Sequence, residues 1–209
     1  MIIALDGPAA AGKGTLTRKL AEYYNLAMLD TGLIYRAVGL KAVLKGDPSD
    51  NGIAIEAAKS LKPLDLEMKN IRGEGAAKYA SLVAAIPAVR DILLGFQQDF
   101  AHNPPVGKSG SILDGRDIGT IVCPDTKFKL YITASLEVRT DRRYKELQER
   151  GEEAIRSAVL DDMKARDQRD STRALSPLTP ARDAKIIDSS YFNAEEVFSL
   201  AKKFIDSQT

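Results

Sequence analysis

Residues 7–15 carry the clearest chemistry in the sequence, and they read Gly-Pro-Ala-Ala-Ala-Gly-Lys-Gly-Thr. Glycines allow backbone N–H groups to converge on phosphate oxygens, and the N-terminus of a following helix adds positive potential. Lys13 supplies a point charge for β- and γ-phosphates, while Gly14 or Thr15 stands where a ligand of Mg²⁺ belongs. Gly14 departs from the pattern G-x-x-x-x-G-K-[ST], which has Ser or Thr there. We therefore predict a phosphate-binding loop; the alternative is a glycine-rich turn without a ligand.

Charged residues also stand at the ends of two further predicted strands. The run DTGLIYR at 30–36 follows one strand, and the run DGRD at 114–117 closes another. In an open parallel sheet, ligands bind beyond the carboxyl ends of the strands. We therefore expect Arg36 to bind a second phosphate in the crevice of Lys13, and Asp114 to hold Mg²⁺ directly or through water. The alternatives are a surface arginine at a helix start and a solvated turn.

A third charged region, at 153–173, continues an apolar helical stripe. The apolar residues of the stripe are Ile155, Val159 and Met163. The charged residues that continue it are Arg166, Arg169, Asp170 and Arg173, and arginines on the preceding predicted helix are Arg139, Arg142 and Arg143. Charge runs are usually solvated faces, but this one occupies the inward face, so we expect it to meet a ligand. Phosphoryl transfer needs cations where charge develops, and arginine-bearing lids exclude water.

The elements that must position these residues read as an α/β fold. Apolar runs with polar or glycine-containing turns after them predict buried parallel strands at Ile2–Leu5, Leu26–Leu29, Ser111–Leu113, Phe128–Ile132 and Lys185–Ile187. Helical patterns lie between them, which favours a sheet covered by helices on both faces. Two stretches, at about 38–104 and about 145–176, interrupt the alternation and read as excursions from the core. Pro87 fits as an early residue of a helix within the first stretch.

Composition excludes several classes of protein. The chain has 209 residues, with 30 Lys and Arg against 29 Asp and Glu, which argues against a general nucleic-acid or membrane-surface protein. Cys123 and His102 are the only residues of their types, so a disulfide within the chain and a Ser-His or Cys-His hydrolase are not expected. The sequence has neither an 18-residue apolar run nor a signal-peptide pattern. We expect a cytoplasmic monomer without nucleic-acid or membrane partners.

The motifs together resemble the bacterial cytidylate kinases, the CMP/dCMP kinases, over almost the whole chain. The ending GKGT at 12–15 is more similar to nucleoside-monophosphate kinases than to GTPases, and the Asn-Lys-x-Asp segment of GTPases does not occur. The other matching segments are DTGLIYR at 30–36, Ser81 with VAAIPAVR ending at Arg90, DGRDIGT at 114–120, ARDQRDSTRA at 165–174 and Asp188-Ser189.

This resemblance implies a fold and a division of the chain. The fold is a P-loop NTPase fold with a five-stranded parallel sheet in the order 2-3-1-4-5, an NMP-binding insertion and a short lid. The core would comprise residues 1–37, 105–144 and 166–209, the insertion residues 38–104, and the lid residues 145–165. Segment 62–76 is shorter than the family's usual insertion, which carries extra strands, and Ile71-Arg72 keeps the anchor of that region.

The resemblance also implies roles for individual residues. ATP would be bound by Gly7, Pro8, Ala9, Ala10, Ala11, Gly12, Lys13, Gly14, Thr15, Arg142 and Arg169, with Mg²⁺ on Thr15 and Asp114. The nucleotide acceptor would be bound by Thr31, Tyr35, Arg36, Ser81, Arg90, Arg116, Asp117, Arg166, Asp170 and Arg173. Within that set, Arg36, Arg116 and Arg173 would hold the phosphate, Ser81, Arg90 and Asp117 the cytosine edge, and Arg166 and Asp170 the pentose. The catalytic residues would be Lys13, Arg116, Arg166 and Arg173.

The implied activity is ATP-dependent phosphorylation of CMP and dCMP to CDP and dCDP, assisted by Mg²⁺. One alternative is a kinase on the same fold for another small acceptor such as UMP, AMP or shikimate. Another is a P-loop ATPase that regulates a partner or remodels nucleic acid, which the even charge balance disfavours.

Overall fold

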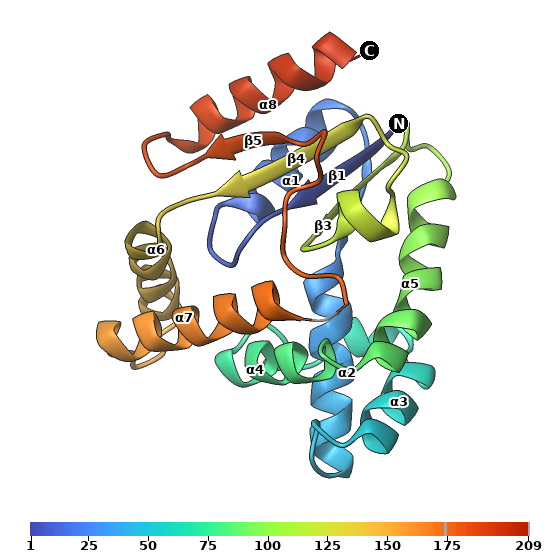
Figure 1. The fold of residues 1–209 in the computed structure, drawn as a ribbon, viewed down its shortest axis with the longest axis vertical. Coiled ribbons are helices and arrows are strands. Elements are labelled where there is room, and N and C mark those ends of the chain that lie inside the picture. The colour runs from blue at the N-terminus through green and yellow to red at the C-terminus, as the bar shows by residue number, and fades with distance from the viewer. Residues whose placement is uncertain (174, 209) are drawn as a thin grey trace.

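The computed structural model describes residues 1–173 and 175–208, which form a five-stranded parallel sheet in the order β2-β3-β1-β4-β5 (Figure 1). The strands are β1 (Ile2–Asp6), β2 (Ala27–Asp30), β3 (Ser111–Gly115), β4 (Phe128–Thr133) and β5 (Lys185–Asp188). The predicted fold, strands and strand order are confirmed. Each strand ends one or two residues later than expected, on a polar residue or a glycine, so residues at these ends face the same edge of the sheet.

Alternating residues of β1, the central strand, point to opposite faces of the sheet and pack into the two halves of the hydrophobic core. Ile3 and Leu5 pack on one face with α1 (Lys13–Tyr23) and α8 (Ala194–Gln208). Ala4 packs on the other face with α2 (Thr31–Lys45) and α5 (Pro87–His102). This is the period-2 pattern of a strand that is buried on both sides, and each large aliphatic side chain buried here stabilises the fold by about 1.5–3 kcal/mol.

The first excursion is helical throughout. Between α2 and α5 lie α3 (Asn51–Lys59), the 3₁₀ turn η1 (Pro63–Glu67) and α4 (Glu74–Val83), and no strand occurs in residues 38–104, all of which belong to the described part. A Cβ on Gly39 of α2 would come within 2.7 Å of Tyr79 Cβ, so a glycine lets α4 pack closely against α2. Pro87 is the first residue of α5, as predicted.

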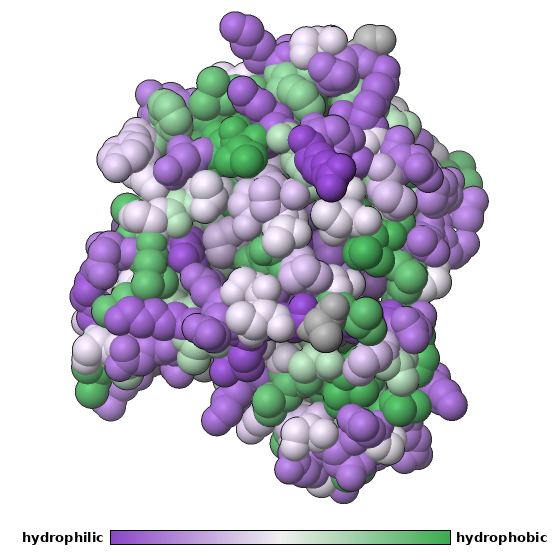
Figure 2. Space-filling view, viewed as in Figure 1, coloured by the Kyte–Doolittle hydropathy of each residue, from purple (hydrophilic) through white to green (hydrophobic). Residues whose placement is uncertain are grey.

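The second excursion is a helical hairpin of α6 (Leu136–Glu149) and α7 (Arg156–Thr172), and α7 crosses alongside α4 (Figure 1). Val159 and Met163 are buried against Leu147, as the stripe predicted. The expectation for Ile155 is wrong: this residue precedes α7 with an extended backbone, and its side chain is 72% exposed. On the face of the molecule that Figure 1 shows, the surface over α6 and α7 is mostly hydrophilic (Figure 2).

The predicted domain limits 145 and 165 lie inside α6 and α7, and the division into core, insertion and lid stays a prediction. Ala174, the last residue of the motif at 165–174, and Thr209 lie outside the described residues. Among the described helices, none alone has the length and apolar character needed to cross a membrane; a single bent pair, Gly75–Val83 with Pro87–His102, meets the criterion by length and composition together.

Candidate active site

The loop between β1 and α1 is shaped by glycines. Gly7 has a φ of +145°, and a Cβ at this position would lie 1.9 Å from the carbonyl oxygen of Ile132, so no side chain fits. Gly12 has a φ of +92°, in the left-handed region, and is the N-cap of α1. The loop thus wraps the N-terminus of a helix at the carboxyl edge of the sheet, which is the geometry of an anion cradle.

Lys13 lies at the base of this cradle. Its Nζ donates a hydrogen bond to the carbonyl oxygen of Pro8 at 3.0 Å and lies 3.6 Å from Asp114 Oδ1. Burial lowers the pKa of Lys13 to about 8, and the positive charge of Arg116 also lowers it. Burial likewise raises the pKa of Asp114. In the described part of the chain Lys13 forms an ion pair with Asp114 alone, and a buried cation of this kind is suited to an additional anion, such as a phosphate.

Oxygen ligands suitable for Mg²⁺ stand on both sides of Lys13. Asp114 Oδ2 lies 4.0 Å from where a Cβ on Gly14 would be, so the carboxylate faces the loop. Thr15 is exposed, and its Oγ1 accepts a hydrogen bond from Arg18 at 3.3 Å. A hydroxyl and a carboxylate are the oxygen donors that Mg²⁺ prefers, alongside substrate phosphates, so this donor set fits the ion.

A crevice extends from the loop toward the region that follows β5. It is lined by residues 10–16 together with Arg18, Arg72, Arg142, Glu146, Glu149, Ser189, Phe192, Asn193, Ala194 and Val197. Arg142 donates to Ser189 Oγ at 2.9 Å and to the Ser189 carbonyl at 2.7 Å, while Ser189 Oγ donates to the carbonyl of Ala11 at 2.9 Å. Arg142 is therefore on the phosphate-loop side, where its predicted role requires it.

A second pocket adjoins the loop. Every residue predicted to bind the acceptor lines it except Arg36, and these residues are Thr31, Tyr35, Ser81, Arg90, Arg116, Asp117, Arg166, Asp170 and Arg173. They come from α2, α4, α5, α7 and the turn after β3, so tertiary packing assembles this pocket. Arg36 does not line the pocket but lies close enough for its charge to act on Arg116 and Arg166, and it donates to the carbonyl oxygen of Ile71 at 3.1 Å.

Asp170 is the centre of the charges in this pocket. Arg116 Nε lies 3.2 Å from its Oδ2, and Arg166 and Arg173 each approach the carboxylate to 3.9 Å. Burial opposes the charge of Asp170, but the three arginines outweigh burial and hold its pKa below the usual range. Burial lowers the pKa of Arg166 to about 9, with a further lowering by Arg116.

Several arginine N–H groups of the pocket lack a hydrogen-bond partner. Within the described residues, the buried nitrogens without one are Nε of Arg90, Nε of Arg166, and Nε and Nη2 of Arg173. Buried donors are rarely left unpaired, because the loss of solvation is not offset. These unpaired donors in one pocket indicate an anionic or oxygen-rich ligand.

Arg90 and Asp117 form a buried ion pair on the wall of this pocket. Arg90 Nη1 also donates to the carbonyl of Ala84 at 3.3 Å, and its guanidinium lies 5.4 Å from the ring centroid of Tyr35. A carboxylate beside a guanidinium presents an acceptor next to donors, which is the pattern that a cytosine edge complements.

Thr31 makes a bond within the fold. Its Oγ1 donates to the carbonyl oxygen of Asp114 at 2.8 Å, so it links the start of α2 to the end of β3.

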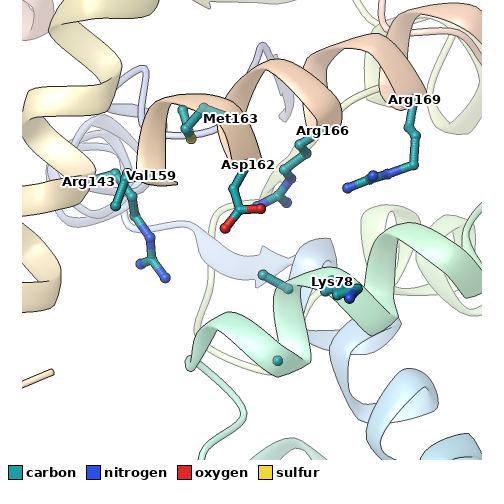
Figure 3. Close-up of a pocket in the computed structure, with 9 residues that line it drawn as sticks. Lys78, Arg143, Val159, Asp162, Met163, Arg166 and Arg169 are labelled. Atoms are coloured by element: carbon teal, nitrogen blue, oxygen red, sulfur yellow. The ribbon is translucent and has the colours of Figure 1, made fainter. Parts of the chain in front are cut away.

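Arg169 lies away from the phosphate loop, for which it was predicted. Its Nε donates to Ser81 Oγ at 3.0 Å, joining α7 to α4. Figure 3 shows Arg166 and Arg169 extending from α7 toward α4, where Lys78 lies. This crevice between α4 and α7 also includes Arg143, and it adjoins the acceptor pocket because Arg166 lines both. The role of Arg169 in ATP binding stays a prediction.

Asp6 is a residue that sequence reasoning missed. Its carboxylate accepts hydrogen bonds from the backbone N–H groups of Ile118 at 2.8 Å and Gly119 at 2.7 Å. These bonds hold the π-helical turn η2 (Ile118–Val122), which directly follows Asp117. Burial raises the pKa of Asp6 to about 7, although both hydrogen bonds lower it. The sequence feature that could have identified this residue is its acidic side chain directly before Gly7, the first residue of the loop.

Arg139 braces the helical hairpin. It forms two hydrogen bonds with the carboxylate of Asp167, at 3.1 and 2.6 Å, and Nη1 donates to the carbonyl of Ala9 at 3.4 Å. Its guanidinium is thereby engaged in holding α6 against α7 and the phosphate loop. Arg139 and Asp167 are 28 residues apart in the sequence, so no local sequence pattern predicted that they would pair.

The chain is similar to known proteins over nearly its whole length. The family model described as cytidylate kinase matches residues 3–207. Similar curated proteins include a cytidylate kinase of Paramagnetospirillum magneticum, 54% identical over 99% of this chain and 98% of the relative. A cytidylate kinase of Rhodospirillum rubrum is 51% identical over 96% of this chain and 95% of the relative.

The likeness to a solved structure bears only on the fold of the chain. The crystal structure of an uncharacterized protein from Eubacterium ventriosum aligns with a TM-score of 0.58 and 16% identity, and the alignment covers 99% of both chains.

Proposed function

This chain belongs to the cytidylate kinase family, and we propose that it is a (d)CMP kinase, which phosphorylates CMP and dCMP with ATP as the donor. The single observation that carries this function is the meeting of two anion sites at one edge of the sheet. The cradle of Lys13 lies beside a pocket whose buried arginine N–H groups lack partners among the described residues. Such a pair of sites suits transfer between two phosphates.

On the donor side, residues 7–15 bind the phosphates of ATP through backbone N–H groups, and Lys13 binds the β- and γ-phosphates. Arg142 contacts the donor nucleotide at the mouth of the crevice that it lines with Ser189. Thr15 and Asp114 would hold Mg²⁺, which would supply positive charge beside the phosphates of the donor.

On the acceptor side, Arg116 and Arg173 bind the phosphate of CMP together with Arg36, whose Nη1 also donates to the carbonyl of Ile71. Arg166 and Asp170 bind the pentose. Thr31 and Tyr35 complete the wall of the pocket.

The base is read by a hydrogen-bond pattern. The amino group of cytosine donates to Asp117, while its N3 and O2 accept from Arg90 and Ser81. Uracil presents a carbonyl oxygen where cytosine has the amino group, so two acceptors would face each other at Asp117. Mismatches of this kind at buried polar groups give strong discrimination.

Transfer follows an in-line path, in which positioning and charge neutralisation suffice without a covalent enzyme intermediate. Lys13, Arg116, Arg166 and Arg173 meet the charge that develops on the transferring group. Residues 38–104 act as the moving insertion, and residues 145–165 as the lid that keeps water from competing as the acceptor.

The test is ADP production from Mg·ATP with CMP, dCMP, UMP, AMP and GMP in turn. Strong stimulation by CMP and dCMP, with weak UMP and no purine response, is the expected result. A preference for UMP would favour the alternative acceptor. ATP turnover that needs no nucleotide acceptor would point instead to an ATPase.

We further propose that the protein works in the cytoplasm as a monomer. Its balanced charge supports the proposal that it has no nucleic-acid or membrane partners. Light scattering after gel filtration tests the oligomeric state.

A further inference from the structure

The turn before α4 is held on both sides by arginines from other parts of the molecule. Arg36 of α2 donates to the carbonyl of Ile71 at 3.1 Å, and Arg150, which ends α6, donates to the carbonyl of Arg72 at 2.6 Å. Two successive carbonyls therefore tie this short turn to the core and to the helical hairpin. Both ties use backbone atoms of the turn, so they do not depend on which side chain occupies position 72.

The side chain of Arg72 is left available by this arrangement. It is 60% exposed, and the one ion pair that it forms with another described residue joins Nη1 to Asp30 Oδ2 at 3.5 Å. A single exposed contact of this length stabilises little. Arg72 also lines the crevice of the phosphate loop, together with residues 10–16 and Arg142. A residue of the insertion thus stands at the donor site.

Asp30, the partner of Arg72, stands among the cations of both substrate sites. Its negative charge raises the pKa of Lys13 on the donor side and the pKa values of Arg36 and Arg116 on the acceptor side, partly countering their burial. Asp30 therefore supplies negative charge between the two sites in the absence of a ligand. Nucleotide phosphates bring stronger negative charge to the same place, and a guanidinium binds phosphate oxygens through paired N–H groups.

We propose that Arg72 is a catalytic residue that leaves Asp30 and binds the polyphosphate of the donor from the side of the insertion. This inference rests on the proposed function. It makes the insertion serve both substrates: Arg36, the expected ligand of the acceptor phosphate, holds the residue next to Arg72. Acceptor binding at Arg36 is thereby linked to the position of a cation at the donor, which favours transfer to the acceptor over transfer to water.

The experiment compares the unmodified chain with Arg72→Ala, Arg72→Lys and Lys69→Ala. Lys69 is the matched control, because it is an exposed cation of the same turn and has no ion pair among the described residues. Initial rates are measured with ATP varied at saturating CMP, and with CMP varied at saturating ATP. Thermal unfolding of each variant checks the fold.

For Arg72→Ala we expect kcat/KM for ATP to fall about 100-fold, the lower end of the range for loss of one donor to a developing anion. KM for CMP should stay within about threefold, because the base and pentose contacts are untouched. Arg72→Lys keeps the charge but loses the paired N–H donors of the guanidinium, so its kcat/KM for ATP should stay about tenfold below that of the unmodified chain. Lys69→Ala should stay within about twofold.

Three results would overturn the inference: kcat/KM for ATP in Arg72→Ala within about threefold of the unmodified chain, an equal loss in Lys69→Ala, or a loss confined to KM for CMP. If Arg72→Ala unfolds, full activity of a folded Arg72→Lys would also overturn it. Absence of CMP-dependent turnover in the unmodified chain would overturn the proposed function itself, and the inference with it.

Discussion

The donor and acceptor sides of the crevice are built in opposite ways. The donor cradle is one continuous segment, residues 7–15, shaped by backbone geometry at Gly7 and Gly12. The acceptor pocket takes its side chains from α2, α4, α5, α7 and the turn after β3. On the donor side Lys13, the buried cation of the cradle, has one ion pair among the described residues, with Asp114. On the acceptor side, arginines and carboxylates are already paired with each other.

This difference teaches how each side responds to a ligand. Backbone N–H groups that point into a cradle need no rearrangement when a phosphate arrives. Paired side chains must exchange a protein partner for a ligand group, so binding on the acceptor side is coupled to movement of the elements that carry them. We therefore expect donor variants to affect chemistry and acceptor variants to affect substrate choice.

Lys13→Ala gives the largest effect and tests the donor side. We expect kcat to fall by about 10³-fold or more, because Lys13 is the buried cation at the base of the cradle and its charge meets the β- and γ-phosphates. The fold should persist, since the loop is shaped by glycines. Single-turnover rates and circular dichroism measure the two effects, and near-normal turnover would remove Lys13 from the phosphate site.

Arg90→Ala and Ser81→Ala test the acceptor side. For Arg90→Ala we expect kcat/KM for CMP to fall about 100-fold while KM for ATP stays within about twofold, because the variant loses a base contact and leaves Asp117 buried without its partner. Ser81→Ala should act in the same direction with a smaller loss. Steady-state kinetics with each substrate varied in turn measures kcat/KM for CMP and KM for ATP separately. Equal losses on both substrates would mean that these residues support the fold rather than read the base.

A pH profile sharpens the donor side further. The pKa of Lys13 is lowered to about 8 in the free protein by burial and by Arg116 and Arg166, against the raising effects of Asp114 and Asp30. Below that pKa the ammonium is charged and binds phosphate; above it the charge is lost. We expect kcat/KM for ATP to fall about tenfold per pH unit above about pH 8.

Lys13→Arg serves as the control for this profile, because a guanidinium keeps its charge over the same range. That variant should be less active but lack the alkaline decline. An unmodified chain with a flat profile would show that Lys13 does not titrate near pH 8.

Arg169→Ala gives the smallest expected effect and decides to which side this residue belongs. Its Nε contacts Ser81, so we expect a threefold to tenfold rise in KM for CMP, about the loss of one partly buried hydrogen bond, with KM for ATP unchanged. Steady-state kinetics with each substrate varied in turn measures both KM values. A rise in KM for ATP alone would support the donor role that the sequence suggested.

The local features could be predicted from the sequence, and the others depended on the packing of distant segments. The strands and the loop follow from apolar runs and glycine positions. The contact of Arg169 with Ser81 arises because α7 crosses α4, and no spacing within either helix reports that crossing. The outward direction of Ile155 follows from where α7 begins, one residue later.

Asp6 shows the same limit. Its bonds to Ile118 and Gly119 form because β1 and β3 are neighbours in the sheet, which then places η2 over the end of β1. The family resemblance supplied the expected acceptor residues, and all except Arg36 line one pocket.

The position of β1 in the middle of the sheet has a consequence for how the chain is made. Both its neighbours, β3 and β4, lie more than a hundred residues further along the chain. At ordinary rates of translation, the apolar segment Ile2–Asp6 therefore waits on the order of ten seconds on the ribosome before either partner emerges. Long-range parallel pairing is also slow once the partners exist. The strand that leads into the phosphate loop is thus exposed to aggregation until its partner strands emerge.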